Sequence, residues 1–250
     1  MKNTSNSRPG DQLIFALDAA DYDEAESWIE LLSGHVGMFK VGKELFTSVG
    51  PKIVDSIKQK GGRVFLDLKF HDIPNTVARA AEAAVKMNVD MFNVHAAGGS
   101  KMLSETARAV AACAQKQGIP QPIVLAVTVL TSLNNDDLKE IGFAHTTNDL
   151  VIRLAGMAQK AGVSGVVASP QDIEALRRDI GGDFIIVTPG IRSSTEPVKD
   201  DQKRTRSAFE AVKAGADYIV VGRPIRQAKD PLAACRQIVQ EIADGLAARN

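Results

Sequence analysis

An acid and an amine, Asp67 and Lys69, stand two positions apart inside one apolar run of the sequence. Residues two apart on an extended strand point to the same face, so both side chains should project together. Asp18 and Lys40 close or end two other apolar runs, and Asp72 follows in the loop after Lys69. Burying one such charge without a partner costs on the order of several kcal/mol. The five residues therefore make most sense as an alternating array of carboxylates and ammoniums.

Each of these charges also has a structural interpretation. Asp18 has the side chain preferred at a helix N-cap, and Lys40 is compatible with an edge position or an amine that reaches out to water. Asp67 and Lys69 are compatible with an ion pair that takes no part in chemistry. These alternatives stay open residue by residue. The coincidence of all of them favours a reactive site.

Two segments combine glycine and arginine in a way that indicates a phosphate site. Gly190 and Gly222 let backbone N–H groups approach an anion closely, and Arg192 and Arg223 carry planar guanidinium groups that match phosphate oxygens. A surface salt bridge is the alternative for either arginine alone. The hydroxyls of Thr128 to Ser132 suit either a heterocyclic ligand or a turn.

His71 and His95 lie near the ends of two apolar runs. Neither has a serine, a cysteine or a metal-ligand spacing around it. We expect both to be structural histidines.

The elements that must position these residues alternate between short apolar runs and helical patterns. This alternation predicts a parallel sheet wrapped by helices, and eight such units predict a single α/β (β/α)8 TIM barrel. An open doubly wound sheet is the alternative, but no Gly-x-Gly-x-x-Gly motif follows the first run. The predicted strands are Leu13 to Leu17, Met38 to Val41, Arg63 to Leu68, Met91 to Val94, Ile123 to Val129, Gly165 to Ala168, Phe184 to Val187 and Tyr218 to Val221.

A similar short sequence motif precedes three of these strands. Each copy contains a turn residue suited to a left-handed conformation, at Asn88, Gly162 and Gly215. These turns are expected on the stability face of the barrel, so the opposite loops should carry the chemistry. Two of those loops are long, Leu130 to Asn148 and Thr188 to Arg206, which is typical of lids and binding segments.

The 250-residue chain has 30 Lys plus Arg and 30 Asp plus Glu. This balance gives no net field that would attract nucleic acid or an anionic membrane, and no segment is apolar over the length of a membrane span. Cys113 and Cys235 are interpreted as buried thiols in a reducing compartment, which predicts a cytoplasmic protein. Residues 1–10 are predicted to be a disordered tail rather than a signal peptide, and residues 11–250 the catalytic barrel domain.

Six segments together resemble the orotidine 5′-phosphate decarboxylase family, in its short bacterial form. The likeness runs from about Leu13 to the C-terminal helix, and its most specific part is the decapeptide from Asp67 to Thr76. The segments are Leu17-Asp18, Phe39-Lys-Val-Gly42, Asp67-Leu-Lys-Phe-His-Asp-Ile-Pro-Asn-Thr76, Val127-Thr-Val-Leu-Thr131, Thr188-Pro-Gly-Ile-Arg192 and Val221-Gly-Arg-Pro224.

The resemblance implies conversion of orotidine 5′-monophosphate to UMP and CO₂, the last step of de novo pyrimidine synthesis, with no metal or organic cofactor. It implies that Lys69 protonates C6 and that Lys40, Asp67 and Asp72 complete the charged network. Asp72 is expected to come from the neighbouring subunit of a homodimer. The substrate contacts that the resemblance implies are Asp18 and Lys40 at the ribose, Thr131 at the pyrimidine, Arg192, Gln202, Gly222 and Arg223 at the phosphate, and further contacts at Asp67, Ile73, Thr76 and Pro189.

Two other functions are compatible with the same sequence. A sister barrel uses the Asp-x-Lys-x-x-Asp core to hold Mg²⁺ and decarboxylate a sugar phosphate, but the ammonium of Lys40 would repel the ion. A catalytically inactive nucleotide-binding barrel is the other alternative, because a fold alone does not establish turnover.

Overall fold

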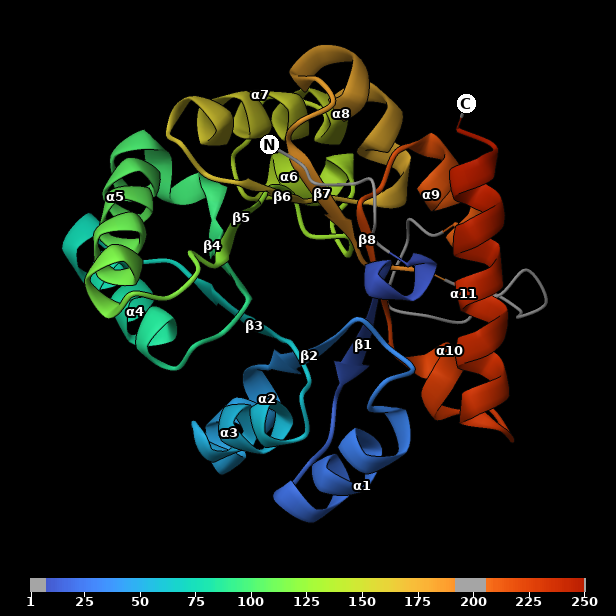
Figure 1. Cartoon of the computed structure of the whole chain (residues 1–250). Coiled ribbons are helices and arrows are strands. Elements are labelled where there is room, and N and C mark those ends of the chain that lie inside the picture. Colours follow the sequence, from blue (N-terminus) through green and yellow to red (C-terminus); the bar gives the residue numbers. More distant parts are fainter. Residues whose placement is uncertain (1–7, 192–205, 250) are drawn as a thin grey trace.

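The computed structural model describes residues 8–191 and 206–249, and within them eight parallel strands close into a barrel (Figure 1). Neighbours along the chain pair with each other, and β1 pairs with β8 through Leu13 and Ile219. The predicted (β/α)8 barrel is confirmed, and the open-sheet alternative is excluded. The strands are β1 (Leu13–Leu17), β2 (Met38–Gly42), β3 (Val64–Phe70), β4 (Met91–His95), β5 (Ile123–Val127), β6 (Gly165–Val167), β7 (Ile185–Thr188) and β8 (Tyr218–Val221).

Helices surround the ring of strands on the outside (Figure 1). Within the described ranges, no helix combines the length and the apolar character needed to cross a membrane. The α-helices are α1 (Tyr22–Leu32), α2 (Lys43–Val49), α3 (Lys52–Gln59), α4 (Pro74–Lys86), α5 (Gly99–Gln117), α6 (Asn135–Glu140), α7 (Thr147–Lys160), α8 (Ile173–Ile180), α9 (Ala208–Ala214), α10 (Arg223–Arg226) and α11 (Pro231–Ala247). Short 3-10 turns are η2 (Pro9–Gln12), η3 (Ala96–Gly98) and η4 (Pro170–Asp172).

The predicted strands match the observed ones within a few residues, and the two largest differences have local causes. β3 runs on to Phe70 because Phe70 pairs with Val94 beyond an irregularity in the ladder. β5 ends at Val127, before the predicted Val129, because its ladder with β6 stops at the pair of Val127 and Val167. At the N-terminus, η2 gives Pro9 and Gly10 regular structure inside the predicted tail, while residues 1–7 lie outside the described residues.

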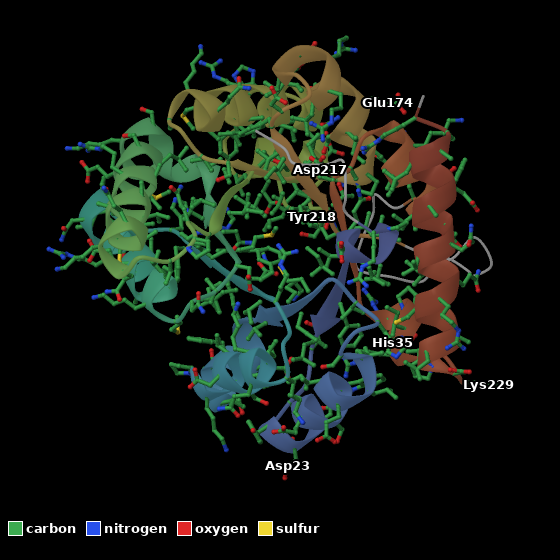
Figure 2. All side chains as sticks on the ribbon, in the orientation of Figure 1. Asp23, His35, Glu174, Asp217, Tyr218 and Lys229 are labelled. Carbon is green, nitrogen blue, oxygen red and sulfur yellow. The ribbon has the colours of Figure 1, made fainter. Side chains whose placement is uncertain are left out.

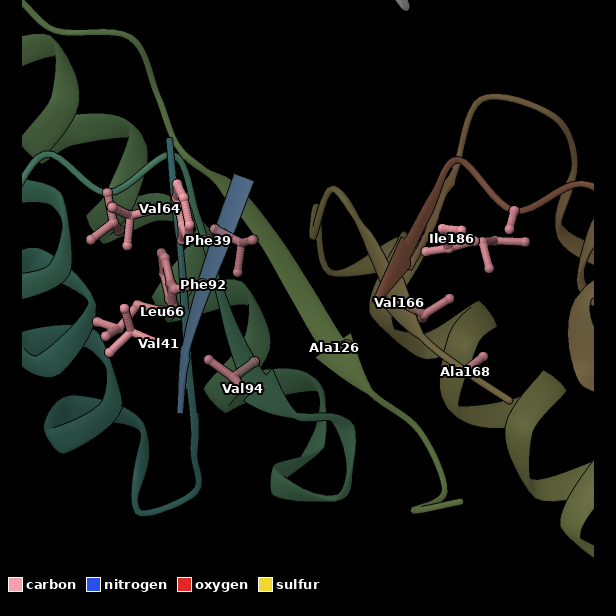
Figure 3. Packing of buried hydrophobic residues seen from close by; sticks show 14 of the residues in the cluster. Phe39, Val41, Val64, Leu66, Phe92, Val94, Ala126, Val166, Ala168 and Ile186 are labelled. Atoms are coloured by element: carbon pink, nitrogen blue, oxygen red, sulfur yellow. The ribbon is translucent and has the colours of Figure 1, made fainter. Parts of the chain in front are cut away.

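The strands are apolar on both faces, and alternate side chains serve two separate clusters. Outward side chains such as Val41, Leu66 and Val94 pack against the helices (Figure 3). Inward side chains fill the barrel itself and form a second cluster. Its members are Ile14, Ala16, Met38, Phe65, Met91, Leu125, Val187 and Val220.

The turns that precede β4, β6 and β8 each form a hydrogen bond to the preceding strand in the sequence, which is β3, β5 or β7. All three contain a residue with positive φ, at Asn88, Gly162 and Gly215, as their sequences predict. A side chain two residues further on accepts an N–H from the first or second residue of the neighbouring strand. The three bonds are Val64 N–H to Asp90 (2.7 Å), Val124 N–H to Ser164 (3.2 Å) and Ile186 N–H to Asp217 (2.8 Å).

Candidate active site

The charged residues form the next inward layer above the apolar cluster inside the barrel. Because inward residues are spaced by two along a strand, each charged or polar side chain follows an apolar one at that spacing. This alternation brings residues from four consecutive strands to the C-terminal mouth. The pairs are Ala16 with Asp18, Met38 with Lys40, Phe65 with Asp67, and Met91 with Asn93.

Asp67 is the centre of a line of alternating charges. Its Oδ1 lies 2.5 Å from Nζ of Lys69, and its Oδ2 lies 3.4 Å from Nζ of Lys40. Nζ of Lys40 also lies 3.2 Å from Oδ1 of Asp18. Asp67 and Lys40 are nearly buried, whereas half of the Asp18 side chain is exposed at the mouth. Four of the five charges of the predicted array, all except Asp72, are therefore joined within one chain.

The environment keeps the central pair of this line charged. Burial by itself would raise the pKa of Asp67, but the ammoniums of Lys40 and Lys69 and the hydrogen bonds to the carboxylate outweigh it and lower that pKa. Burial would lower the pKa of Lys40, yet the charges of Asp67 and Asp18 raise it. An anionic Asp67 beside a cationic Lys40 is thus the stable state near neutral pH.

A cavity of about 250 Å³ opens over this layer at the carboxyl ends of the strands. Charged groups lie on one side and apolar side chains from β5, β6 and β8 on the other, so the cavity suits a ligand with one polar and one apolar part. Eight of the predicted site residues line it: Asp18, Lys40, Asp67, Lys69, Thr131, Pro189, Gly222 and Arg223.

Lys69 reaches this cavity by a route that strand geometry does not predict. Its φ is 53°, in the left-handed region that side chains other than glycine rarely adopt. The pairing between β3 and β4 shifts between Leu66 and Phe70, so the strand is bulged where Lys69 lies. The prediction that Asp67 and Lys69 project together is correct, but regular alternation is the wrong reason for it.

The end of the cavity nearest β7 and β8 has the backbone features of an anion site. Gly190 has φ of 81°, which favours glycine. A Cβ on Gly222 would lie 3.2 Å from Cβ of Ala16, so this position also favours the absence of a side chain. Arg223 follows directly and lines the cavity. The other two predicted phosphate contacts, Arg192 and Gln202, lie outside the described residues.

The hydroxyls after β5 divide into two groups. Thr128 is buried, and its hydroxyl donates to the carbonyl of Val167, so it has a structural bond. Thr131 is half-buried and lines the cavity. Of the two threonines, only Thr131 is placed to contact a ligand.

Three predicted residues stay outside the cavity of their own chain. Asp72, Ile73 and Thr76 are exposed around the start of α4, and Asp72 Oδ1 accepts the N–H of Ile73 at 2.6 Å. Ile73 is 66% exposed, which is unusual for an isoleucine.

The rings of His71 and His95 are in contact at a tilt of 37°, beside the charged layer. Their ring centroids are 5.2 Å apart. Burial, followed by the nearby charges of His71 and Lys69, lowers the pKa of His95 to about 4. His95 is therefore neutral at physiological pH, which fits the structural role predicted for it.

Sequence reasoning missed one polar residue of the site, Asn93 on β4. Its side chain lines the cavity, is 1% exposed, and bonds both to Asp67 and to the backbone of Lys69. The available signal was an asparagine inside an otherwise apolar strand, where a buried amide needs partners. The apolar wall was also missed: Phe65, Val127, Val129, Leu130, Val167, Ala168 and Val220.

A closed eight-stranded barrel with a charged cavity at the carboxyl ends of its strands defines a (β/α)8-barrel enzyme. Comparison with known families places it more closely: residues 11–238 match the model of the orotidine 5′-phosphate decarboxylase / HUMPS family. The chain belongs to this family.

Individual relatives agree with the assignment over nearly the whole chain. An orotidine 5′-phosphate decarboxylase of Syntrophus aciditrophicus is 58% identical over 99% of both chains, and one of Trichlorobacter lovleyi is 52% identical over 94% of this chain and 96% of its own. The crystal structure of orotidine 5′-phosphate decarboxylase from Lactobacillus acidophilus superimposes with a TM-score of 0.80 at 37% identity, covering 92% of this chain and 98% of the other. The chain is a carbon–carbon lyase of the decarboxylase kind.

Proposed function

We propose that this enzyme converts orotidine 5′-monophosphate to UMP and CO₂, the last step of UMP synthesis, without a metal or organic cofactor. The observation that carries the proposal is the line of charges from Lys69 through Asp67 and Lys40 to Asp18 inside the cavity. Relatives named for this activity support the choice of substrate.

In the proposed reaction, the bond between C6 and the carboxylate carbon breaks and its electron pair stays on C6. The ammonium of Lys69 stabilises that negative charge and then gives C6 a proton, so that UMP and CO₂ form. The neutral amine regains a proton from solvent. Asp67 holds Nζ of Lys69 at 2.5 Å and so fixes the cation before the charge develops.

The other parts of the substrate are assigned to residues along the cavity. We assign the ribose hydroxyls to Asp18 and Lys40 and the pyrimidine to Thr131, all of which line the cavity. The phosphate is assigned to Arg192, Gln202, Gly222 and Arg223. The substrate contacts also include Ile73, Thr76 and Pro189.

Asp72 is proposed to act in the site of a second subunit, so that the functional unit is a homodimer. Its exposure at the start of α4 and its place outside its own cavity support this arrangement.

The donor set favours ammonium chemistry over a bound Mg²⁺. Nζ of Lys69 and Nζ of Lys40 contact the two different oxygens of Asp67, so a divalent cation at this carboxylate would meet two positive charges. This argues against the sugar-phosphate decarboxylase of the sister family. We place residues 11–250 in one catalytic domain and the protein in the cytoplasm, and the buried free thiols of Cys113 and Cys235 fit that location.

The proposal is tested by mixing purified protein with orotidine 5′-monophosphate in excess EDTA and following the loss of orotate absorbance. Wild-type protein should turn over, Lys69→Ala should lose at least about 10³-fold in kcat, and Lys116→Ala on the outer helix α5 should match wild type. Activity that requires Mg²⁺ and a sugar phosphate would replace the proposal with the sister-family function. Binding of UMP without turnover of either substrate would indicate an inactive nucleotide-binding barrel.

A further inference from the structure

Asn93 lies opposite the irregular part of β3. Leu66 pairs with Phe92 and Phe70 pairs with Val94, so the three residues from 67 to 69 face the single residue Asn93 on β4. A bulge of this kind leaves backbone groups without their regular ladder partners. The bulge also contains Lys69 in its left-handed conformation.

The amide of Asn93 supplies the partners that the bulge lacks. Its Oδ1 accepts the backbone N–H of Lys69 at 2.8 Å, in place of a carbonyl of the neighbouring strand. Its Nδ2 donates to Oδ1 of Asp67 at 2.7 Å. The same carboxylate oxygen accepts Nζ of Lys69 at 2.5 Å. One side chain therefore holds both the backbone of the lysine and the carboxylate that aims its amine.

The burial of Asn93 makes these bonds important. The side chain is 1% exposed, so its amide and the groups it contacts have little water to replace a lost partner. A left-handed residue other than glycine costs roughly 1–2 kcal/mol and persists only where its surroundings fix it. Among the contacts of the Lys69 backbone, the bond to Asn93 Oδ1 holds the N–H inside that strained turn.

We propose that Asn93 is a positioning residue that holds the bulge of β3 in shape, so that Nζ of Lys69 faces the reacting carbon rather than the wall of the barrel. The inference rests on the proposed function, because it assigns Lys69 the proton transfer. Asn93 acts through Lys69 and Asp67 and is not assigned a bond to the substrate.

The test replaces Asn93 by leucine, which has a similar size and no polar group, and by serine, which is too short to reach both partners. Misplacement of a reacting group by about 1 Å costs roughly 100-fold in rate, so both variants should lose about 100-fold or more in kcat. The affinity for UMP, measured by calorimetry, should stay within about fivefold of wild type because the ground-state contacts remain.

Thr106→Val is the matched control. Thr106 is 0% exposed, and its hydroxyl donates to the carbonyl of Met102. The substitution therefore also removes one buried hydrogen bond, but on α5, outside the cavity. A similar loss of stability with unchanged kcat would show that weakened folding alone does not explain the Asn93 effect.

Two kinetic results would overturn the inference. The first is a folded Asn93→Ser enzyme with kcat within about threefold of wild type, and the second is a parallel fall of kcat and UMP affinity, as expected for a wall of the binding site. If wild-type protein does not decarboxylate orotidine 5′-monophosphate, the proposed function is refuted and kinetics no longer test the inference. The geometry is then judged from a crystal structure of Asn93→Ser, and an unchanged Lys69 conformation would reject the positioning role.

Discussion

At the residue scale, Lys40 and Lys58 show how similar ion pairs in one barrel serve different purposes. Lys40 contacts Asp67 and Asp18 inside the cavity. Lys58 contacts Asp90 at 2.6 Å, and Asp90 in turn accepts the first N–H of β3. The contacts of Lys40 line the cavity, whereas the contact of Lys58 holds a strand at the opposite end of the barrel.

We therefore predict that Lys40→Met loses about 10²-fold or more in kcat/KM, because a preplaced cation disappears from the reacting site. Lys58→Met should keep the wild-type kcat and lose on the order of 1–3 kcal/mol of stability instead, because Asp90 loses a partner. Steady-state kinetics and urea unfolding of both variants check the contrast. Equal kinetic losses in the two variants would contradict it.

His95 gives a prediction for the pH dependence of stability. Its pKa is about 4 in the folded protein and near 6.5 in the unfolded chain, so between these values the unfolded state binds more protons. The stability from this group is complete above pH 6.5 and is lost as the pH falls toward 4. The loss is at most about 3 kcal/mol.

His95→Asn should remove this part of the pH dependence. Urea unfolding at a series of pH values measures the difference between the variant and wild type, so that contributions from other groups cancel. The free energy of unfolding of wild type, relative to that of the variant, should fall as the pH decreases from 6.5 to 4. Parallel curves over that interval would show that His95 is protonated alike in both states.

At the scale of elements, Arg177 on α8 joins two of the turns at the base of the barrel. Its guanidinium donates to the carbonyls of Gly215 and Phe184 and to Asp217. Asp217 also accepts the N–H of Ile186 at the start of β7, and Figure 2 labels this aspartate at the base of β8. One side chain thus links α8 to both β7 and β8.

Arg177→Met is expected to destabilise the protein by about 3–5 kcal/mol, because Asp217 loses the guanidinium 2.6 Å from its carboxylate and the carbonyls of Gly215 and Phe184 lose donors. Arg178→Met is the matched control. The Arg178 side chain is 70% exposed, and within the described residues its hydrogen bonds and its ion pair are to the neighbouring Asp179. Its effect should stay within about 0.5 kcal/mol. Chemical denaturation of both variants distinguishes a structural link from a surface pair.

Elements of this fold could be predicted from sequence because their signals are local. Apolar runs separated by helical patterns predict the eight strands, and β1 and β8 have the predicted bounds. The convergence of Asp18, Lys40 and Asp67 also follows, since the carboxyl ends of parallel strands share one mouth. Charge type and strand position were sufficient for these three residues.

The rest depends on register between strands that no local pattern reveals. The left-handed conformation of Lys69 comes from a bulge defined by its pairing with β4, and nothing in a Leu-Lys-Phe sequence indicates it. The bond between Asn93 and the backbone of Lys69 could not be predicted either, because it depends on the bulge that places the two residues opposite each other. Likewise, Asp90 and Asp217 are recognisable as turn residues in the sequence, but their strand partners are set by the closed barrel.

At the scale of the whole molecule, the proposed homodimer makes each site a product of two chains. Asp72 and Ile73 are exposed at the start of α4 and contribute nothing to the cavity of their own chain. A carboxylate that completes the charge line from a second chain would make activity depend on association. Two defective chains should then complement each other, because a symmetric dimer contains two equivalent sites.

The complementation experiment mixes Asp72→Ala with Lys69→Ala after reversible dissociation. Each variant alone has two defective sites, but a mixed dimer has one site with both native residues and one with neither. Random reassociation makes half of the dimers mixed, so activity should recover to about a quarter of the wild-type value per chain. If Asp72 instead served its own chain, every site would keep one defect, and the mixture would show only the average of the two residual activities.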